Sequence, residues 1–376
     1  MSTLNVNTIN AAPSGQAVAV DISNPRSFRN LIINGAMQVA QRGTSSTDHG
    51  HHTVDRWAHY RANVDENPTF SQADVASGTT PYELGFRKSL KTVNGNQTGG
   101  AGGSDYISLD YKWEAQDIAN SGWNYTSTSS YVTFSFWVKS SVAQNFYFHL
   151  KTVDGTSQNY PMETGTLSAN TWTKITKTIP GDSDLQFDNN NDTGLQMRFM
   201  LYRGTTNTGS ITLNQWGAWN GSVRVPDNTT TWYTTNDATF ELTGAQFEVG
   251  SYATDFEHRS YGVELRRCQR YYQIQAGDSD AHIEAGKGQG SASVDVGHAL
   301  AVPLRAEPTV TLASNRVFRH DGYSDSTATP TVIQWNDKSP MSSIIAFNLS
   351  GHSGITSNYV TNWCPKAANL KLNSEL

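Results

Sequence analysis

Cysteine is scarce in this sequence, which has 376 residues and only two cysteines, Cys268 and Cys364. Two cysteines cannot form the disulfide framework that stabilises small secreted domains. We expect Cys268 to be a buried thiol, because it lies on the apolar side of an expected helix. A Cys268–Cys364 disulfide is the alternative, and a reducing cytoplasm disfavours it.

Charged residues are also few. They make up 16% of the sequence, against about 25% in a typical soluble domain, and the formal net charge is −6. No run of Lys or Arg is longer than the Arg266-Arg267 pair, so the charge pattern of a nucleic-acid-binding protein is missing. Aromatic residues reach 11%, and Ser, Thr, Asn and Gly are common. This composition is typical of a β protein with polar loops, and it would also suit a surface that binds sugars.

Long apolar runs are missing as well. No stretch approaches the roughly 20 apolar residues of a membrane-spanning helix, so no membrane insertion is expected. The first residues, Met1–Asn7, show neither the basic nor the apolar region of a secretion signal. We therefore expect the protein to be assembled in the cytoplasm of the producing cell and released by lysis, as a virion component would be.

Recognisable catalytic motifs are absent. Gly351-His-Ser-Gly354 lacks the spacing of a nucleophile elbow, and Gly286-Lys-Gly-Gln-Gly290 lacks the Gly-Lys-Ser/Thr ending of a phosphate loop. Carboxylates are scattered, and the sequence cannot place two of them at the separation that a glycosidase needs. We expect no enzyme activity.

What the sequence does contain is β-type alternation. Apolar and polar residues alternate over 131–139, 146–151 and 195–201, and turn signals such as Asn94-Gly95 separate the segments. The residues expected to point inward are Val132, Phe134, Phe136, Val138, Phe146, Phe148, Leu150, Leu195, Met197, Phe199, Leu201, Phe240 and Leu242. Many strands without intervening helices predict an all-β fold, a sandwich or jelly roll.

The β pattern continues beyond residue 273. Strands are expected within 292–302, 309–313, 331–335 and 343–349, with Gly- and Ser-rich loops between them. These segments predict a second, smaller β-sandwich of about a hundred residues.

One helix is expected, between the two β regions. Tyr261, Leu265, Cys268 and Tyr272 recur at helical spacing and predict one apolar stripe. Ser260 stands at the N-cap position. The acidic and basic residues match the helix dipole, with Glu264 near the start and Arg266, Arg267 and Arg270 near the end. We interpret this segment as a packed joint between domains.

Two segments carry a family resemblance. The sequence QFEVGSYATDFEHRSYGVELRRCQRYY, residues 246–272, resembles the end of a jelly-roll module of tail-fibre and receptor-binding proteins from tailed bacteriophages, particularly marine ones. Residues 30–44 and Thr53–Trp57 resemble the start of the same module. The two motifs bracket residues 30–272, and the resemblance implies a carbohydrate-binding-module-like jelly roll at 30–259. Together with the sequence patterns above, this predicts an all-β chain with a linking helix at 260–273 and a C-terminal β-sandwich at 274–376.

Residues 1–29 are expected to form a strand-like attachment segment. Leu4, Val6 and Thr8 alternate with polar residues, and 17–22 is a second short apolar run, but the segment is too small for a core of its own. In the fibres that this chain resembles, the corresponding part trimerises and attaches to a tail or capsid protein of the particle. A frayed tail is the alternative.

Two aromatic groups are candidate sugar-binding platforms. Trp216, Trp219, Trp232 and Tyr233 lie in a loop-rich stretch, and Trp137, Tyr147 and His149 share the solvent-side parity of neighbouring strands. Flat rings stack on sugars, although aromatic side chains also cover sandwich edges or line subunit interfaces. Because charge is scarce, we expect stacking and neutral hydrogen bonds to carry recognition, with weak salt dependence.

Two candidate metal sites can be named. An oxygen-rich loop containing Asp182, Asp184, Asp188 and Asp192 could hold a structural Ca²⁺, although it lacks the spacing of an EF-hand, and an exposed turn is the simpler interpretation. The cluster Asp48-His-Gly-His-His52 could bind a transition metal, but a solvated loop is favoured because nothing fixes its geometry.

Three functions are compatible with these observations. The first is a homotrimeric phage fibre or receptor-binding protein that recognises a host surface glycan without catalysis. The second is a purely structural virion protein, such as a capsid-decorating fibre or a tail connector. The third is a glycan-cleaving enzyme, for which the sequence offers no positive sign.

Overall fold

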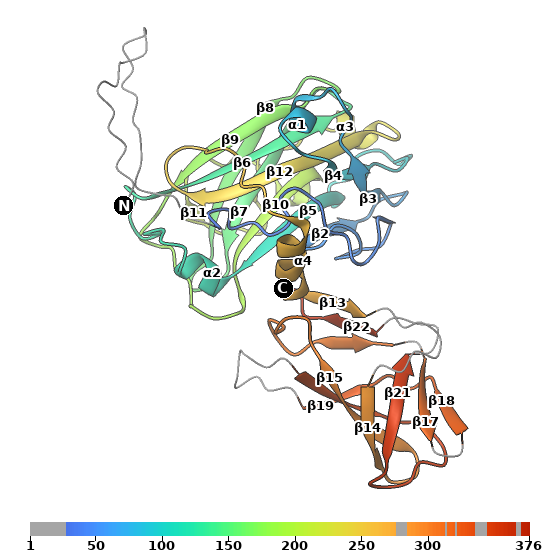
Figure 1. Ribbon diagram of the computed structural model, residues 1–376. Helices are drawn as coiled ribbons and strands as arrows, with labels where there is room; N and C mark the ends of the chain where they lie inside the picture. Colours follow the sequence, from blue (N-terminus) through green and yellow to red (C-terminus); the bar gives the residue numbers. More distant parts are fainter. Residues whose placement is uncertain (1–27, 276–283, 313, 320–321, 335–343, 366–369) are drawn as a thin grey trace.

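The computed structural model describes residues 28–275, 284–312, 314–319, 322–334, 344–365 and 370–376. The chain is all-β, as the sequence predicts, and the described strands form four sheets. Figure 1 shows two β units with the helix α4 (Tyr261–Gln269) between them. No helix in the described residues is long and apolar enough to cross a membrane. Residues 1–27, which hold most of the expected attachment segment, lie outside the described part of the chain.

The first unit is a jelly-roll sandwich of two six-stranded antiparallel sheets. Sheet A has the order β1-β3-β4-β12-β6-β9 and sheet B the order β11-β8-β7-β10-β5-β2. The strands of sheet A are β1 (Ser45–Ser46), β3 (Thr69–Asp74), β4 (Lys88–Val93), β12 (Thr239–Val249), β6 (Tyr131–Ser140) and β9 (Thr173–Pro180). Those of sheet B are β11 (Gly217–Ala218), β8 (Gln158–Thr166), β7 (Asn145–Thr152), β10 (Thr193–Arg203), β5 (Tyr106–Glu114) and β2 (Trp57–Ala62).

Four short helical turns decorate this sandwich and were not expected from the sequence. They are α1 (Thr80–Glu83), α2 (Ala115–Ala119), the 3-10 turn η1 (Thr205–Asn207) and α3 (Thr231–Thr234). Each has three to five residues, too few to produce a helical period in the sequence.

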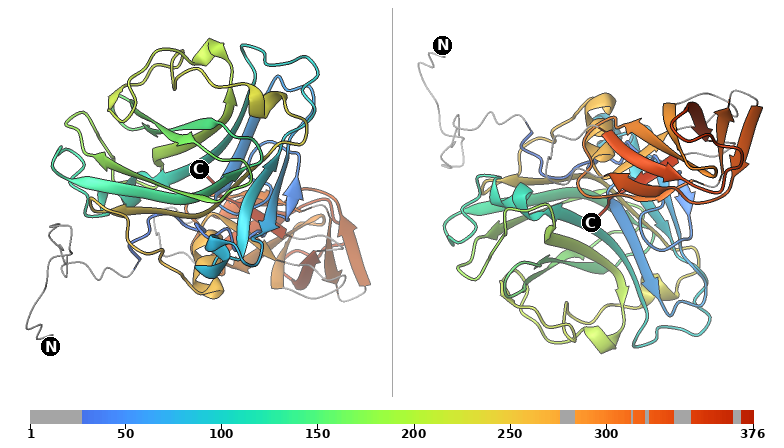
Figure 2. Two further views of the ribbon diagram at one scale, coloured as in Figure 1. Left: turned by 90° about the horizontal axis from the view of Figure 1, so that it is seen from above. Right: turned by 90° about the horizontal axis from the view of Figure 1, so that it is seen from below.

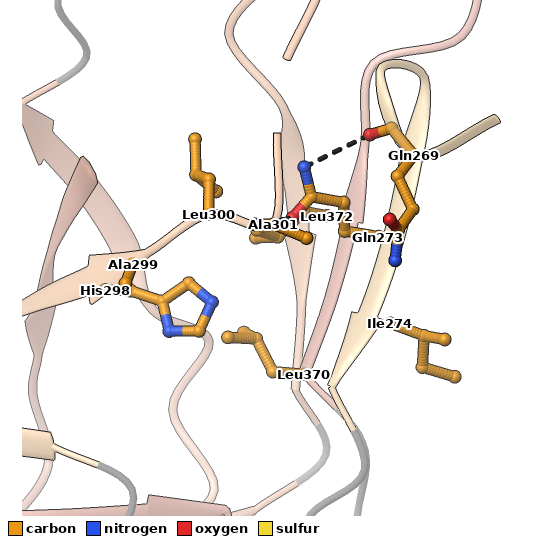
Figure 3. Close-up of a pocket in the computed structure, with 9 residues that line it drawn as sticks. All are labelled: Gln269, Gln273, Ile274, His298, Ala299, Leu300, Ala301, Leu370 and Leu372. Atoms are coloured by element: carbon orange, nitrogen blue, oxygen red, sulfur yellow. Dashed lines mark hydrogen bonds between the residues drawn. The ribbon is translucent and has the colours of Figure 1, made fainter. Parts of the chain in front are cut away.

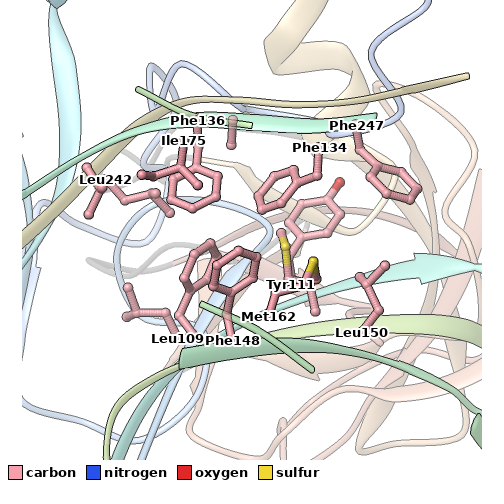
Figure 4. Packing of buried hydrophobic residues seen from close by; sticks show 14 of the residues in the cluster. Leu109, Tyr111, Phe134, Phe136, Phe148, Leu150, Met162, Ile175, Leu242 and Phe247 are labelled. Carbon is pink, nitrogen blue, oxygen red and sulfur yellow. The ribbon is translucent and has the colours of Figure 1, made fainter. Parts of the chain in front are cut away.

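The core lies between sheets A and B. Every residue predicted to point inward from β6, β7, β10 and β12 is buried. Figure 4 shows the aromatic side chains of the two sheets pointing toward one another. The ring of Phe136 in sheet A lies 5.4 Å from that of Phe148 in sheet B, edge to face, and Phe148 stacks on Phe199 at 5.1 Å. Burying each such side chain stabilises the fold by about 1.5–3 kcal/mol, so this packing holds the two sheets together.

The second unit is a smaller sandwich with its own hydrophobic core, formed by residues 294–372. A three-stranded sheet, β13-β22-β16, packs against a seven-stranded sheet of order β18-β17-β21-β14-β15-β20-β19. The three strands are β13 (Tyr272–Gln275), β22 (Leu370–Asn373) and β16 (Thr309–Thr311). The seven are β18 (Gly322–Ser326), β17 (Asn315–Arg319), β21 (Val360–Pro365), β14 (Glu284–Gln289), β15 (Ser293–Ala299), β20 (Ile344–Leu349) and β19 (Thr331–Gln334). The expected strands correspond to β15, β16, β19 and β20, whereas the other six strands in the described part of this unit were not predicted.

The buried face of α4 differs from the predicted stripe. Tyr261 is 56% exposed and Leu265 only partly buried, while Glu264 and Cys268 are buried within the helix. The helix ends at Gln269, so Tyr272 belongs to β13. Two members of the stripe do pack inward, since Leu265 lies against the cluster that contains Cys268, whereas the predicted inward position of Tyr261 and the extension of the helix to Tyr272 were wrong. Glu264 is buried as well, because its carboxylate accepts a bond from the backbone N–H of Asn34 and pairs with Arg259. Ser260 does occupy the N-cap position, without a side-chain cap bond.

The two segments that carry the family resemblance meet in one buried network. The amide of Asn30 donates to the carbonyl of Ala245 (3.0 Å), and its oxygen accepts from the N–H of Phe247 (3.0 Å). Arg259 donates to the carbonyl of Asn30. A Cβ on Gly35 would lie 2.1 Å from the carbonyl oxygen of Ala245, so only glycine fits there. These residues close the sandwich onto α4 and therefore have a structural role.

A buried ion cluster joins the second unit to the first. The carboxylate of Glu375 pairs with the guanidinium of Arg56 and lies 3.4 Å from that of Arg42. Burial alone would raise the pKa of Glu375, but the surrounding positive charges outweigh it and lower the pKa to about 2. Arg56 also lies over the ring of Tyr271, at 3.4 Å from its centroid. The cluster fixes the chain after β22 against β2 and β5.

Candidate functional site

The outward-facing side of sheet B gathers polar and aromatic side chains. Strand alternation turns Leu109, Leu150 and Met197 into the core and their neighbours outward. The strand register then places His149 of β7 beside Arg198 of β10, and Arg198 beside Asp110 of β5. We call this surface the outer face of sheet B; its residues include Tyr60, Tyr106, Asp110, Tyr147, His149, Lys151, Asn159, Gln196, Arg198 and Arg203.

A charged pair lies at the centre of the outer face. The Nε of Arg198 donates to both oxygens of Asp110, at 2.7 and 2.8 Å, and Nη2 makes a further bond to Oδ2. The amide of Gln196 donates to the same Oδ2 at 2.6 Å. Asp110 is almost completely buried, whereas the Arg198 side chain is 20% exposed. The carboxylate therefore fixes Arg198, and Arg198 presents its remaining surface to solvent.

Beside this pair, Trp219 stacks on His149. Their rings are 5.5 Å apart and inclined by 14°. The Asn159 amide donates to the carbonyl of Arg224 (2.9 Å), which turns its oxygen toward Nδ1 of His149 at 2.7 Å. Nδ1 is therefore the protonated nitrogen, and burial, followed by the charge of Arg198, lowers the pKa of His149 to about 3. His149 is neutral at pH 7 and serves as a rigid support for the partly exposed indole.

The segment that carries Trp219 runs from β10 to β12 and folds over the outer face (Figure 2). It is held by the pairing of β11 with β8, by a bridge between Thr208 and Val225, and by the bond from the N–H of Trp219 to the carbonyl of Ser157 (2.8 Å). A cavity of about 220 Å³ lies between this segment and β8; its walls include Asn159, Pro161, Gln215 and Trp216. Asn159 thus contacts both the cavity and His149.

Two tyrosines and three further cations extend the outer face. Arg198 lies 5.7 Å from the ring centroid of Tyr60, and Arg203 lies 4.5 Å from that of Tyr106. Lys151 and Arg224 lie 4.6 and 5.4 Å from the ring of Trp219. Both tyrosines remain partly exposed. The face therefore combines partly exposed rings with hydrogen-bond donors at fixed positions.

The first predicted aromatic group is dispersed by the fold. Trp232 and Tyr233 are buried in the core, so the prediction that they form an exposed platform was wrong. The indole of Trp232 donates to the carbonyl of Thr239 (3.0 Å), and Tyr233 stacks on Tyr202 at 4.1 Å. Trp216 is 8% exposed and donates to the carbonyl of Pro180. Only Trp219 of this group lies partly exposed on the outer face.

The second predicted group is divided between the two sheets. Trp137 lies on β6 in sheet A, whereas Tyr147 and His149 lie on β7 in sheet B. The strands are successive in sequence but do not pair, so the expectation that the three side chains share one surface was wrong. Trp137 instead packs near Phe86 and Phe256. His149 is buried, and Tyr147 is partly exposed on the outer face.

The candidate metal ligands are not brought together. Within the described residues, no three His, Cys, Asp or Glu side chains are placed to share a metal ion, and this holds for Asp182, Asp184, Asp188 and Asp192. The Asp182 carboxylate accepts from the N–H of Asp184, which is an Asx turn. In the histidine cluster, His49 packs against Tyr60 and His51 lies 3.8 Å from Glu375.

No protein-family model matches the chain, and no curated protein sequence matches it. Solved structures with a similar fold include the enzymatically active domain of tailspike protein 4 from bacteriophage CBA120, at 9% identity and a TM-score of 0.31 over 59% of this chain. The match spans only 22% of that tailspike chain.

Two carbohydrate-binding proteins are among the other similar structures. A family 11 carbohydrate-binding module from Clostridium thermocellum, in complex with a mixed-linked tetrasaccharide, matches 54% of this chain and 91% of its own at 14% identity and a TM-score of 0.24. The N-terminal cellulose-binding domain of β-1,4-glucanase C from Cellulomonas fimi matches 57% of this chain and 99% of its own, at 11% identity and a TM-score of 0.27. These scores are too low to assign the chain to either family.

Sequence reasoning missed most of the outer face, including Asp110, Asn159 and Arg198. The sequence did contain a signal for two of these residues, because Asp110 and Arg198 stand at polar positions in strands where apolar and polar residues alternate. Alternation shows which side of a strand is polar, but it does not show which strands are neighbours. The juxtaposition of β5, β10, β7 and β8 comes from long-range pairing.

A second, larger cavity lies in the other β unit. It has a volume of about 310 Å³ and is lined by residues of α4, β13, β15 and β22 and of the segment after β15, among them Gln273, Leu300 and Leu370 (Figure 3). The Gln273 amide donates to the carbonyls of Gln269 (3.1 Å) and Val302 (2.7 Å). Its walls are mainly aliphatic, and the polar side chain of Gln273 is already bonded within the protein.

Proposed function

We propose that this protein is a virion fibre or receptor-binding protein of a tailed bacteriophage, and that it binds a host surface glycan on the outer face of sheet B. The observation that carries the glycan proposal is the placement of Trp219. Its indole is partly exposed, is held by stacking on the neutral ring of His149, and is surrounded by hydrogen-bonding groups. A rigid aromatic ring with fixed polar neighbours is the arrangement that recognises the apolar face and the hydroxyls of a sugar.

The surrounding chemistry supports the proposal. Arg198 is fixed by Asp110, so it can donate to a ligand oxygen with little loss of conformational freedom. Tyr60 and Tyr106 offer further rings and hydroxyls along the same face. The cavity beside Trp216 is large enough for a sugar ring and begins at Asn159, next to the His149–Trp219 stack.

The virion role rests on the resemblance of residues 30–44, 53–57 and 246–272 to phage fibre modules. We propose that the protein acts as a homotrimer, that residues 1–29 attach it to a tail or capsid protein of the particle, and that it resides in the virion. In the fold the two segments meet in the buried network of Asn30, Gly35 and Arg259, which gives these residues a structural role.

Two other functions make different predictions. A purely structural virion protein would bind no host glycan. A glycan-cleaving enzyme would need a carboxyl group able to transfer a proton, and Asp110 is held by Arg198 and Gln196. We therefore propose binding without hydrolysis, which an assay for new reducing ends in glycan digests would check.

The test compares Trp219→Ala with Trp172→Ala on an array of bacterial envelope polysaccharides. Trp172 is a matched control, because it is also partly exposed with a lysine near its ring (Lys139, 5.0 Å) but lies by β9 in sheet A. We expect Trp219→Ala to lower glycan affinity by about tenfold, or about 1.4 kcal/mol, and Trp172→Ala to leave it unchanged. Equal binding by wild type and a folded Trp219→Ala protein would contradict the proposed site, and the absence of any glycan binding by wild type would favour the structural role.

A further inference from the structure

Four cations lie on the outer face, although the chain as a whole has a net charge of −6. Lys151, Arg198, Arg203 and Arg224 are the cations, and the carboxylate of Asp110 pairs with Arg198. Lys151 and Arg224 approach the indole of Trp219, while Arg198 and Arg203 approach Tyr60 and Tyr106. Positive charge therefore gathers where the rings of the proposed sugar site lie.

Three of these cations have no acidic partner in the described part of the structure. Arg203 donates to the side-chain oxygen of Asn207, and Arg224 donates to the carbonyl of Gly221 (3.0 Å). Lys151 forms no salt bridge with any described residue and lies against Trp219. Glu163, on the outward side of β8, is bonded to the amide of Asn145. Among these four cations Asp110 forms a salt bridge with Arg198, and it attracts Arg224 without contacting it.

The cations also repel one another. Burial, and then the charges of Arg198 and Arg224, lowers the pKa of Lys151. Burial, and then Arg224 and Arg198, lowers the pKa of Arg203 to about 10. Each cation is thus partly removed from water and close to other cations, and a bound anion would relieve this repulsion.

We propose that the ligand of the outer face is an anionic glycan, whose carboxylate or sulfate groups bind Arg224, Lys151 and Arg203 while a sugar ring stacks on Trp219. This inference rests on the proposed function and specifies its ligand. A guanidinium offers paired N–H donors that match a carboxylate or sulfate, and the neighbouring indole selects a ring that carries the acid group. This proposal replaces the expectation, drawn from the sequence, that ring stacking and neutral hydrogen bonds carry recognition. That expectation considered how few charged residues the chain has and not where they lie.

A nucleic acid is the less suitable polyanion. It carries a negative charge at every nucleotide, and the acidic remainder of this protein would repel such a ligand along its length. A polysaccharide with acid groups on only some residues can place them at this local group of cations.

The experiment uses pairs of polymers that differ only in charge. Polygalacturonate is compared with its fully methyl-esterified form, and dextran sulfate with dextran, by calorimetry on the full-length protein; a single-stranded DNA oligomer is the non-glycan polyanion. We expect at least one acidic glycan to bind about tenfold or more tightly than its neutral partner, and its affinity to fall by about tenfold as salt rises from about 0.05 to about 0.5 M. The acidic polymer that binds identifies the acid group as carboxylate or sulfate.

Charge-neutralising variants locate the contact. Arg224→Gln and Lys151→Gln should each weaken binding of the acidic glycan about fivefold to tenfold. Lys174→Gln removes the same charge from an exposed site on β9 in sheet A and should leave binding unchanged. Thermal unfolding of each variant establishes that it is folded.

The outcomes separate this inference from the proposed function. Equal affinity for charged and neutral polymers, with both lost in Trp219→Ala, would overturn the anionic ligand but keep the glycan site. DNA binding as tight as acidic-glycan binding, or equal losses in Lys174→Gln and Arg224→Gln, would also overturn it. Failure of every polymer and of every array glycan to bind would contradict the proposed function itself.

Discussion

At the scale of single residues, burial determines which charges affect stability. Arg56 is 1% exposed, and its guanidinium pairs with Glu375, which is 6% exposed. Replacing one member of such a pair leaves the other charge buried without a partner. Glu375→Gln should therefore destabilise the protein by about 3–5 kcal/mol in denaturant unfolding. Asp74→Asn is the control, since Asp74 pairs with Lys88 at the surface and should change stability by less than about 1 kcal/mol. Equal effects of the two substitutions would show that the Glu375 pair is exposed in solution.

The same residue should produce a pH dependence of known sign. The pKa of Glu375 falls from its ordinary 4.5 to about 2 in the folded protein. A depressed acid pKa contributes stability that is present above about 4.5 and is lost as the pH falls through about 2. Asp55 acts in the opposite sense, because burial, despite Arg42, raises its pKa to about 6. We expect the stability difference between wild type and Glu375→Gln to shrink between about pH 4.5 and pH 2. Glu375 also raises the pKa of Asp55, so the difference should also change near pH 6, where Asp55 titrates. A difference that is independent of pH would contradict the ion pair.

At the scale of elements, α4 provides a test of which helix face is buried. Glu264 is buried and bonds to the backbone of Asn34, whereas Tyr261 is exposed. Glu264→Ala leaves a buried N–H without a partner and should destabilise the protein by about 1–3 kcal/mol. Tyr261→Ala should change stability by no more than about 0.5 kcal/mol. Thermal melts of the two variants measure both effects, and a larger loss in Tyr261→Ala would restore the stripe predicted from the sequence.

The elements also show how far sequence reasoning reaches. Alternation identified the strands at 131–139, 146–151 and 195–201 and their inward residues, because period-two patterning depends only on local geometry. It could not show that β6 and β7 belong to different sheets, since pairing depends on residues distant in the chain. For the same reason Trp137 was grouped wrongly with His149, and the buried Trp232 was assigned to the surface. The buried face of α4 was predicted incorrectly because the sequence alone does not show whether a glutamate is buried and hydrogen-bonded or exposed to solvent.

At the scale of the whole molecule, charge is distributed unevenly. The chain carries a net negative charge, yet a group of four cations lies on the outer face of sheet B, with Lys151 and Arg224 beside Trp219. A net negative charge keeps a protein soluble and discourages unspecific binding to polyanions. The local cations can still bind an acid group at short range. Composition alone therefore could not predict the ligand, whereas the placement of four side chains suggests one.

The proposed trimer gives the last prediction. Single sugar contacts are weak. Once one outer face of a trimer has bound a surface glycan, however, the other two would meet that glycan at a high effective concentration. Residues 1–27 lie outside the described structure, and their alternating apolar pattern is the basis for expecting them to trimerise the chain. Light scattering of the full-length protein at micromolar concentration should give the mass of three chains, and a variant lacking residues 2–27 should give a monomer.

The monomer should retain its affinity for a short soluble oligosaccharide, because the outer face lies within one chain, but should lose about a hundredfold in apparent affinity for a densely coated glycan surface. A full-length monomer would contradict the trimer, and an unchanged affinity of the truncated monomer for the coated surface would show that avidity plays no part in binding.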